Sequence, residues 1–157
     1  MKFRETLPSD PLARARLGNY FQSREMGFTG ETGYTIVFPG DPQFTPPHGV
    51  FLLVEVDHEP IGCGGIRHLE PVLADEKWFE VKHLWIEPAG RGQRLGRRLL
   101  EELERRAMGF GATHAVLDTN ASLEAAGGLY LSAGYHAIEP YNDNPNATNW
   151  YKKALPL

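Results

Sequence analysis

The 157-residue chain is poor in cysteine, lacks a long apolar run and carries no excess of positive charge. Cys63 is the only cysteine, so no disulfide can form within the chain and no cysteine pair is available to bind zinc. No segment approaches the roughly 18 consecutive apolar residues of a membrane span, and residues 1–10 lack the apolar stretch of a signal peptide. We therefore expect a cytoplasmic protein with no membrane partner, in which Cys63 is a small core residue.

Charge and motif spacing exclude further classes of protein. Sixteen Lys and Arg against twenty Asp and Glu give a net charge of −4, whereas nucleic-acid-binding domains usually need a positive surface. The same net charge favours cationic ligands through electrostatic steering. The six histidines show no H-x-x-x-H spacing, so we predict no metal site. The sequences G-x-x-x-x-G-K-[ST] and G-x-S-x-G are absent, so we predict neither a P-loop nor a serine nucleophile elbow.

Hydrophobic patterning predicts one α/β (α+β) domain over residues 1–157. Helices are predicted at 11–27, from 95 to the stop at Gly109, and at 122–133, and strands at 50–56, 61–69, 78–86, 112–118, 135–138 and 149–155. Residues 29–49 are expected to form a long loop of the kind that covers a binding site. In the strand at 78–86 the apolar alternation slips by one between Val81 and Leu84, which indicates a β-bulge at residues 82–83.

Residues 84–103 combine a strand, a turn rich in glycine and arginine, and an amphipathic helix. The N–H groups of a first helical turn have no partners within the helix, and the helix dipole adds positive charge there. An anion such as a diphosphate would therefore fit at residues 91–97. The alternative is a tight turn whose glycines serve only the backbone and whose arginines are solvated.

Three segments carry motifs that occur together in one family. Residues 80–88 read E-V-K-H-L-W-I-E-P, residues 91–96 read R-G-Q-R-L-G, and residues 129–135 read L-Y-L-S-A-G-Y. In this order and at these separations they resemble the central strand, the [Q/R]-x-x-G-x-[G/A] loop and the L-Y-x-x-x-G-[F/Y] segment of the GNAT superfamily of acyl-CoA-dependent N-acyltransferases. The resemblance runs from about residue 50 to residue 155. It implies a mixed, mostly antiparallel central sheet flanked by helices, with a bulged central strand that splays from its neighbour.

The resemblance also implies acetyl-CoA as co-substrate, without a metal. The pantetheine arm would pair with main-chain groups of Leu84, Trp85 and Ile86, and the pyrophosphate would lie on the loop. The loop residues predicted to bind it are Arg91, Gly92, Gln93, Arg94, Leu95, Gly96 and Arg97. Arg94 stands where the family has a second glycine, so a positive φ there would be strained, whereas a helical φ would leave its guanidinium to favour a phosphate. Asn120, at a strand end, would contact the pantetheine or the amine, or else cap the next helix.

Glu80 and Tyr130 are the candidate catalytic residues. Glu80 precedes the bulge, where similar proteins hold a carboxylate that takes a proton from the substrate ammonium, directly or through water. The alternative is a strand glutamate on a solvated face. Tyr130 resembles the family's tyrosine near the thioester sulfur and would act as the acid, and the alternative is a core aromatic. Backbone amides near Leu84 and Trp85 could supply donors to the oxyanion.

The expected reaction is transfer of an acetyl group from acetyl-CoA to a primary amine by direct attack in a ternary complex. The alternatives are a non-catalytic acyl-CoA-binding or sensing module on the same fold, and an anion-binding structural domain. The acceptor would be a small-molecule or peptide amine held between residues 29–49 and the Asn-rich segment 141–146. Asp143 could attract a cationic amine there, unless the segment is a plain Asn/Pro turn. The apolar last strand could pair across a homodimer.

Overall fold

The computed structural model describes residues 1–27, 37–70, 73, 75–120 and 124–156. The strands in these ranges are β1 (Lys2–Thr6), β2 (Gly49–Val56), β3 (Glu59–Leu69), β4 (Trp78–Ile86), β5 (His114–Thr119), β6 (His136–Ile138) and β7 (Asn149–Ala154). The helices are α1 (Pro11–Gly27), α2 (Leu95–Gly109) and α3 (Glu124–Ser132), with short 3-10 turns η1 (Asp41–Phe44) and η2 (Pro88–Gly90). The described strands form one seven-stranded sheet in the order β1-β2-β3-β4-β5-β7-β6. Only β4 and β5 run parallel in it, which confirms the mixed, mostly antiparallel sheet.

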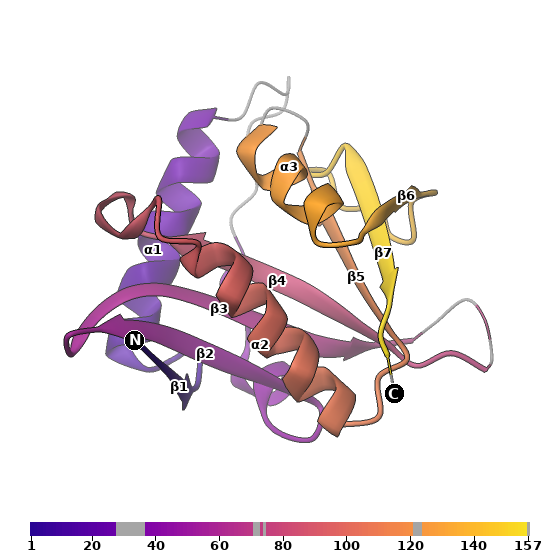
Figure 1. The fold of residues 1–157 in the computed structure, drawn as a ribbon, viewed down its shortest axis with the longest axis horizontal. Helices are drawn as coiled ribbons and strands as arrows, with labels where there is room; N and C mark the ends of the chain where they lie inside the picture. The colour runs from indigo at the N-terminus through magenta and orange to yellow at the C-terminus, as the bar shows by residue number, and fades with distance from the viewer. Residues whose placement is uncertain (28–36, 71–72, 74, 121–123, 157) are drawn as a thin grey trace.

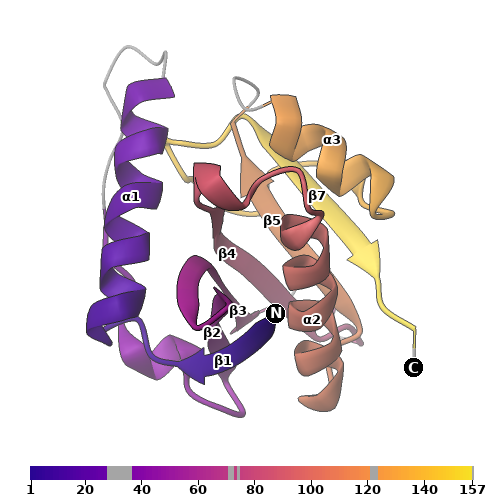
Figure 2. The ribbon, with the colours of Figure 1, turned by 60° about the vertical axis from the view of Figure 1, so that its left-hand side comes forward.

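Helices cover both faces of the sheet, with α1 on one face and α2 and α3 on the other (Figures 1 and 2). Along β2, alternate residues enter two separate cores. Val50, Leu52 and Val54 pack in the cluster that contains the buried side of α2, and Phe51 and Leu53 pack in the cluster that contains α1. Because both faces are buried, β2 reads in the sequence as an almost unbroken apolar run.

The first helix begins as its sequence predicts. Asp10 caps α1, since its Oδ1 accepts hydrogen bonds from the backbone N–H of Leu12 at 3.0 Å and of Ala13 at 3.4 Å. Helix α1 packs against β3 and β4, and η1 packs against β2 and β3. At Gly65 of β3, a Cβ would lie 2.5 Å from the ring of Phe44 of η1. The glycine in this strand therefore makes room for a neighbouring side chain.

The predicted bulge lies in β4. Cys63 pairs with Trp85 and Gly65 pairs with Lys82, so two steps along β3 correspond to three steps along β4. His83, inside the bulge, has a positive φ of 59°. The extra residue restores the alternation, so apolar residues before and after the bulge share the α2 face: Phe79, Val81, Leu84 and Ile86.

The splayed strand pair is also present. Beta-ladder pairing of β4 with β5 covers Trp78–Glu80 opposite residues 114–116. Beyond that point, residues 81–84 and 117–120 line a pocket. The parallel strands therefore separate at the bulge, as the family resemblance implies.

Two details of the sequence interpretation need correction. The strand β1 was not predicted, because K-F-R-E-T offers only Phe3 as an apolar residue; it lies at an edge of the sheet, where charged side chains are tolerated. The last strand, β7, pairs with β5 along one edge and, at Trp150–Lys152, with β6 along the other, so it is not an edge strand of the sheet that could pair along its length across a dimer. The predicted loop 29–49 is described from residue 37 on and contains η1, and the predicted helix start at residues 122–123 falls outside the described residues.

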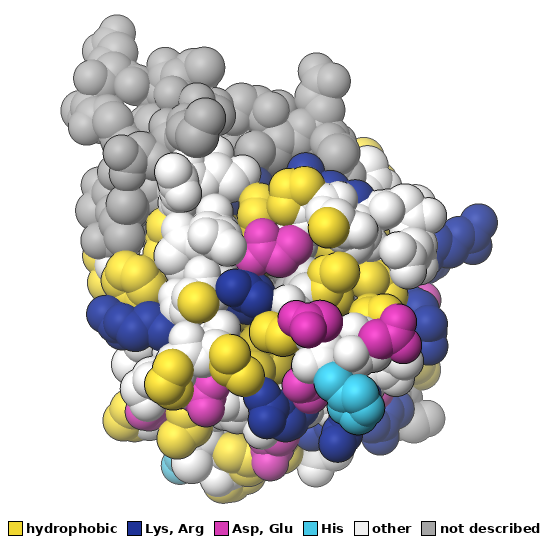
Figure 3. Space-filling view, turned by 90° about the vertical axis from the view of Figure 1, so that its left-hand side faces the viewer, with side chains coloured by type: hydrophobic (Ala, Val, Ile, Leu, Met, Phe, Trp, Pro, Cys, Tyr) yellow, Lys and Arg dark blue, Asp and Glu magenta, His cyan; other side chains and the backbone are white. Residues whose placement is uncertain are grey.

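The surface of the described chain gives no sign of a broad charged face in the view of Figure 3. Acidic, basic and apolar side chains are interspersed there, over the part that is coloured. None of the described helices is both long and apolar enough to span a membrane. The described residues also contain no group of three or more His, Cys, Asp or Glu side chains that could hold a metal ion.

Candidate active site

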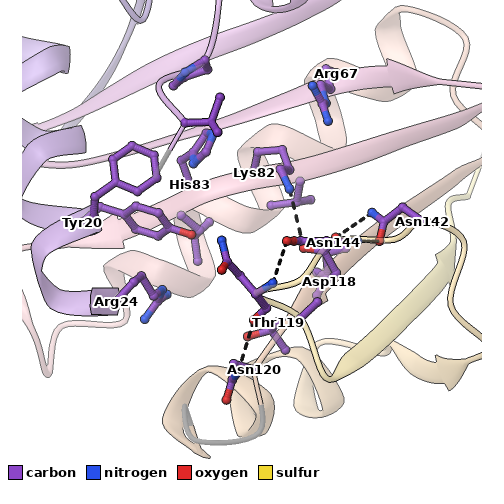
Figure 4. Close-up of a pocket in the computed structure, with 18 of the residues that line it drawn as sticks. Tyr20, Arg24, Arg67, Lys82, His83, Asp118, Thr119, Asn120, Asn142 and Asn144 are labelled. Atoms are coloured by element: carbon purple, nitrogen blue, oxygen red, sulfur yellow. Dashed lines mark hydrogen bonds and ion pairs between the residues drawn. The ribbon is translucent and has the colours of Figure 1, made fainter. Parts of the chain in front are cut away.

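A pocket of about 530 Å³ lies where β4 and β5 separate; we call it the seam pocket. Segments far apart in the sequence form it: α1, residues 37–43, β3, the bulged part of β4, the end of β5, α3 and residues 142–147. In Figure 4, Tyr20 and Arg24 of α1 lie on one side of it, and Asp118, Asn142 and Asn144 lie on the other. The lining of the pocket combines aromatic side chains with several charged and amide side chains.

Tyr130 lines the seam pocket from α3. Its side chain is only 6% exposed and lies among aromatic rings, with the ring centroids of Tyr135 and Tyr151 at 6.0 and 6.2 Å. Burial raises the pKa of the Tyr130 hydroxyl well above its ordinary value. The hydroxyl therefore stays protonated at physiological pH.

Glu80 is fully buried, so it does not lie on a solvated face. Its Oε1 accepts hydrogen bonds from Arg67 Nε at 3.1 Å and Nη2 at 2.9 Å, and its Oε2 accepts one from the Tyr141 hydroxyl at 2.7 Å. Burial and the Glu80 charge raise the pKa of Tyr141, which keeps that hydroxyl a donor. Arg67 lines the seam pocket, whereas Glu80 does not. The candidate base therefore sits behind an arginine.

His83 presents its imidazole to the seam pocket from the bulge. Tyr20 and Phe21 pack edge-on to it, with ring centroids 5.5 and 5.4 Å away. Burial, assisted by the nearby cations Lys82, Arg67 and Arg24, lowers the pKa of His83 to about 3. The imidazole is therefore neutral at physiological pH, and its buried Nδ1 has no hydrogen-bond partner among the described residues.

A polar network ties the segment after β6 to the open end of β5. Asn142 Nδ2 donates to Asp118 Oδ2 at 2.8 Å, and Trp150 Nε1 donates to Asn142 Oδ1 at 2.9 Å. Lys82 Nζ lies 3.6 Å from Asp118 Oδ1 across the gap between β4 and β5 (Figure 4). Asp143, in contrast, is exposed and does not line the pocket, so Asp118 is the one carboxylate among the described lining residues.

A second pocket, of about 470 Å³, surrounds the start of α2; we call it the loop pocket. Its lining residues are Ile86, Gly90, Arg91, Gly92, Arg94, Leu95, Gly96, Arg97, Leu129 and Ser132. No described side chain caps the N-terminus of α2, which leaves the amides of its first turn to face this pocket. The helix dipole and the three arginines in the lining make the site suitable for an anion.

The backbone of the loop turns through two positive φ angles. Gly92 has φ 86°, and Arg94, the N-cap of α2, has φ 58° and ψ 24°. The left-handed conformation that the family meets with a glycine is thus adopted here by an arginine, with the strain that this implies. Arg91 is held in place, because its Nε donates to the Ile86 carbonyl at 3.1 Å and its guanidinium lies 4.9 Å from the Trp85 ring centroid.

The two pockets contain most of the residues predicted from the sequence. Tyr130, Leu84 and Asn120 line the seam pocket, while Ile86 and six of the seven predicted loop residues line the loop pocket. Gln93 lines neither pocket, and the Trp85 side chain packs in the core beneath α1.

Sequence reasoning missed several residues that line the seam pocket: Tyr20, Phe21, Arg24, Arg67, Lys82, His83 and Asp118. The interrupted alternation at the bulge was the one sequence feature that could have drawn attention to Lys82 and His83. The others are brought in by elements that pair or pack far along the chain.

Comparisons with known proteins agree with this architecture. The model of the acetyltransferase (GNAT) family matches residues 18–135. An uncharacterized N-acetyltransferase of Schizosaccharomyces pombe is 33% identical over 104 residues, and the match covers 66% of this chain but only 61% of that protein. An acetyltransferase structure from Streptococcus agalactiae has a TM-score of 0.76 at 20% identity and covers 98% of both chains. An aminoglycoside 6'-N-acetyltransferase complexed with coenzyme A has a TM-score of 0.67 at 14% identity, covering 100% of this chain and 98% of that one.

The two solved structures confirm the expected fold, and the family match extends over more than half of the chain. The match includes all three motifs from which the resemblance was inferred, because they lie between residues 80 and 135. The chain therefore belongs to the GNAT family of acetyltransferases.

Proposed function

We propose that this protein transfers an acetyl group from acetyl-CoA to a primary amine by direct attack in a ternary complex, with residues 1–157 acting as one domain. The observation that carries the proposal is that the two pockets lie next to each other along β4 and α3. Leu84 and Tyr130 line the seam pocket, and their near neighbours Ile86 and Leu129 line the loop pocket. One extended molecule with a diphosphate at one end and a reactive group at the other could occupy both.

The loop pocket has the chemistry that a diphosphate requires. The diphosphate would be held by the uncapped amides of α2 and by the guanidinium groups of Arg91, Arg94 and Arg97. The positive φ at Gly92 belongs to the turn that leads to these amides. The aminoglycoside acetyltransferase of the same fold binds coenzyme A, which supports acetyl-CoA as the co-substrate here. Main-chain groups of residues 84–86 and the amide of Asn120 are the proposed contacts of the pantetheine arm.

Coenzyme A would supply the acetyl group as a thioester, and this chain would manage two protons. As the amine nitrogen bonds to the acetyl carbon and the carbon–sulfur bond breaks, Tyr130 would give its proton to the leaving thiolate. Glu80 would take the proton lost by the amine through a water molecule, because Arg67 rather than Glu80 lines the pocket. Backbone amides near Leu84 and Trp85 would stabilise the charge on the carbonyl oxygen.

The ion pairing of Glu80 favours a second candidate function, a non-catalytic acyl-CoA-binding or sensing module. A carboxylate already bound to Arg67 and Tyr141 is a poor base unless it can exchange partners. Glu80→Gln and Tyr130→Phe separate the two functions, since they lower a reaction rate without abolishing cofactor binding only in an enzyme.

A calorimetric titration of acetyl-CoA with phosphate as competitor, followed by thiol release in a mixture of primary amines, tests the proposal. We expect binding that phosphate cannot displace and thiol release that depends on the amine. Binding without release would favour the sensing module, and binding that phosphate displaces as well as coenzyme A would leave only an anion-binding domain. Cytoplasmic location and homodimerisation stay predictions.

A further inference from the structure

The charges that line the seam pocket are unbalanced. Among the lining residues that the structure describes, three cations, Arg24, Arg67 and Lys82, face one carboxylate, Asp118. Lys82 lies 3.6 Å from Asp118, and Arg67 lies 2.9 Å from the buried Glu80 behind it. Two of the three cations are thus compensated, and one is not.

Arg24 is the uncompensated cation. It has no carboxylate partner among the residues that the structure describes, and its guanidinium carbon lies 4.8 Å from the centroid of the Tyr20 ring. Figure 4 places Arg24 and Tyr20 together on the α1 side of the pocket. An aromatic face supports a guanidinium without neutralising it, so the positive charge is available to a ligand.

A second observation is that all three cations lie close enough to His83 to affect its pKa. The three of them reinforce the lowering of the pKa of His83, which burial begins. His83 and Arg24 both contact Tyr20, and the Nδ1 of His83 is buried without a hydrogen-bond partner among the described residues. This part of the pocket therefore combines an unpaired cation with an unsatisfied polar atom, which is the kind of site that a polar ligand group completes.

Arg67 has donors left for the same ligand. Its three described hydrogen bonds use Nε and Nη2 toward Glu80 and Nη1 toward Gln43. A guanidinium carries five N–H groups, so two N–H groups of Arg67 take part in none of these hydrogen bonds. Asp118, in contrast, is already engaged by Lys82 and by Asn142 at 2.8 Å, which makes it a poor receptor for an ammonium group.

We propose, on the basis of the acetyl transfer proposed above, that the acceptor is a small amine that also carries a carboxylate, such as an amino acid, and that Arg24 binds this carboxylate. The charge of the pocket then becomes balanced in the complex. Because Asp118 and Glu80 are already paired with Lys82 and Arg67, the described lining offers no free carboxylate to stabilise the ammonium form of the acceptor, which favours the neutral amine that attacks.

The proposal reverses what the charge of the whole chain suggests. A net charge of −4 steers cations toward the protein, but surface charges farther away than about 10 Å are largely screened at physiological salt. The groups inside the pocket are closer to the acceptor and less screened. Local charge therefore decides which acceptors bind.

Matched pairs of amines test the proposal on the full chain. Each pair consists of an amino acid and the amine left when its carboxylate is removed, for example tyrosine with tyramine, histidine with histamine, and lysine with cadaverine. Amine-dependent release of coenzyme A thiol gives kcat/KM for each compound. We expect the carboxylate-bearing member of the accepted pair to be preferred by about 10–100-fold, as for a charged hydrogen bond.

Variants locate the preference. Arg24→Gln should lower kcat/KM for the amino acid by about 10–100-fold and leave the decarboxylated amine nearly unchanged, while Arg24→Lys should restore part of the preference. Arg105→Gln, at an exposed position of α2, is the matched control and should change neither value. Thermal melts of all variants exclude a loss of folding, and calorimetry with acetyl-CoA checks that the cofactor still binds.

Two outcomes separate this inference from the proposed function. Preference for the decarboxylated members, or an equal effect of Arg24→Gln on both members of a pair, would overturn the carboxylate assignment while acetyl transfer stands. If acetyl-CoA binds but neither the amino acids nor the decarboxylated amines cause thiol release, the proposed function itself is overturned, and the inference with it.

Discussion

The loop pocket takes seven of its ten lining residues from the single stretch 90–97, whereas the seam pocket collects side chains from α1, β3, β4, β5, α3 and residues 142–147. The loop pocket offers backbone N–H groups at a helix N-terminus, and these groups do not come from particular side chains. The seam pocket offers ionisable and aromatic side chains held by long-range packing. The difference teaches that a site suited to an anion can be encoded locally, while a pocket lined by side chains of several elements depends on the complete fold.

Tyr130→Phe tests most strongly whether the two pockets have separate tasks. Loss of the proton donor should lower kcat by about 10²–10⁴-fold, as expected for a general acid. The affinity for acetyl-CoA should stay the same, because the ring still fills its place beside Tyr135 and Tyr151. Steady-state kinetics and calorimetry measure the two effects. An unchanged kcat would show that the seam pocket does not use this hydroxyl, and the division of tasks would fail.

The same contrast explains what could be predicted from the sequence. The strand at 78–86, the loop at 91–97 and the helix that follows are one continuous segment, so their periodicity and glycine spacing predicted both the bulge and the anion site. Tyr130 could be found only through the resemblance, since an aromatic on a helix is otherwise typical of a core. Arg24 is marked by no sequence pattern, because only the folded chain brings α1 to the pocket between β4 and β5 that Arg24 lines.

The miss at β1 has a related physical cause. Its charged residues fit an edge strand, and only pairing with β2, from Lys2 opposite Glu55 to Thr6 opposite Phe51, makes the segment extended. Such pairing is a property of the sheet rather than of the five residues.

Glu80 was predicted as a candidate, but the arginine and tyrosine that enclose it come from β3 and the segment after β6.

A pH series sharpens the comparison, because side chains titrate and backbone amides do not. The pKa of His83 lies near 3 in the folded protein and near 6.5 in the unfolded chain. The unfolded chain therefore binds the extra proton between these values, so the stability that His83 contributes is present above pH 6.5 and is lost as the pH falls. We expect this contribution to decrease by about 2 kcal/mol between pH 7 and pH 5.

Denaturant unfolding of the protein and of His83→Phe at both pH values measures this contribution. The variant should show a smaller loss of unfolding free energy on acidification, and His68→Gln, at an exposed histidine, should behave like the parent chain. Equal acid sensitivity of the parent and His83→Phe would mean that the imidazole is not held neutral by the pocket.

Gly92→Ala tests the backbone character of the loop pocket. A Cβ at Gly92 meets no atom within 4 Å, so the only penalty arises from the φ of 86°, which an L-residue adopts at a cost of about 1–2 kcal/mol. We expect the loop to relax in the free protein, and the dissociation constant of acetyl-CoA to rise about tenfold as binding restores the strained backbone. Gly109→Ala, also in open space but without a positive φ, should leave the affinity unchanged. An unaltered affinity in Gly92→Ala would argue that the loop binds through side chains.

Arg94→Gly addresses the one loop position where backbone and side chain have opposing demands. Glycine adopts a φ of 58° without strain, so the melting temperature should rise by about 2–4 °C. Removal of the guanidinium should at the same time weaken acetyl-CoA binding by about threefold, because the charge is on the surface and screened. Arg94→Asn separates the effects, since asparagine tolerates this backbone but lacks the charge, and it should lose affinity without as large a gain in stability. Tighter binding by Arg94→Gly would instead mean that the arginine obstructs the amides, and that even this locally encoded pocket is limited by a side chain.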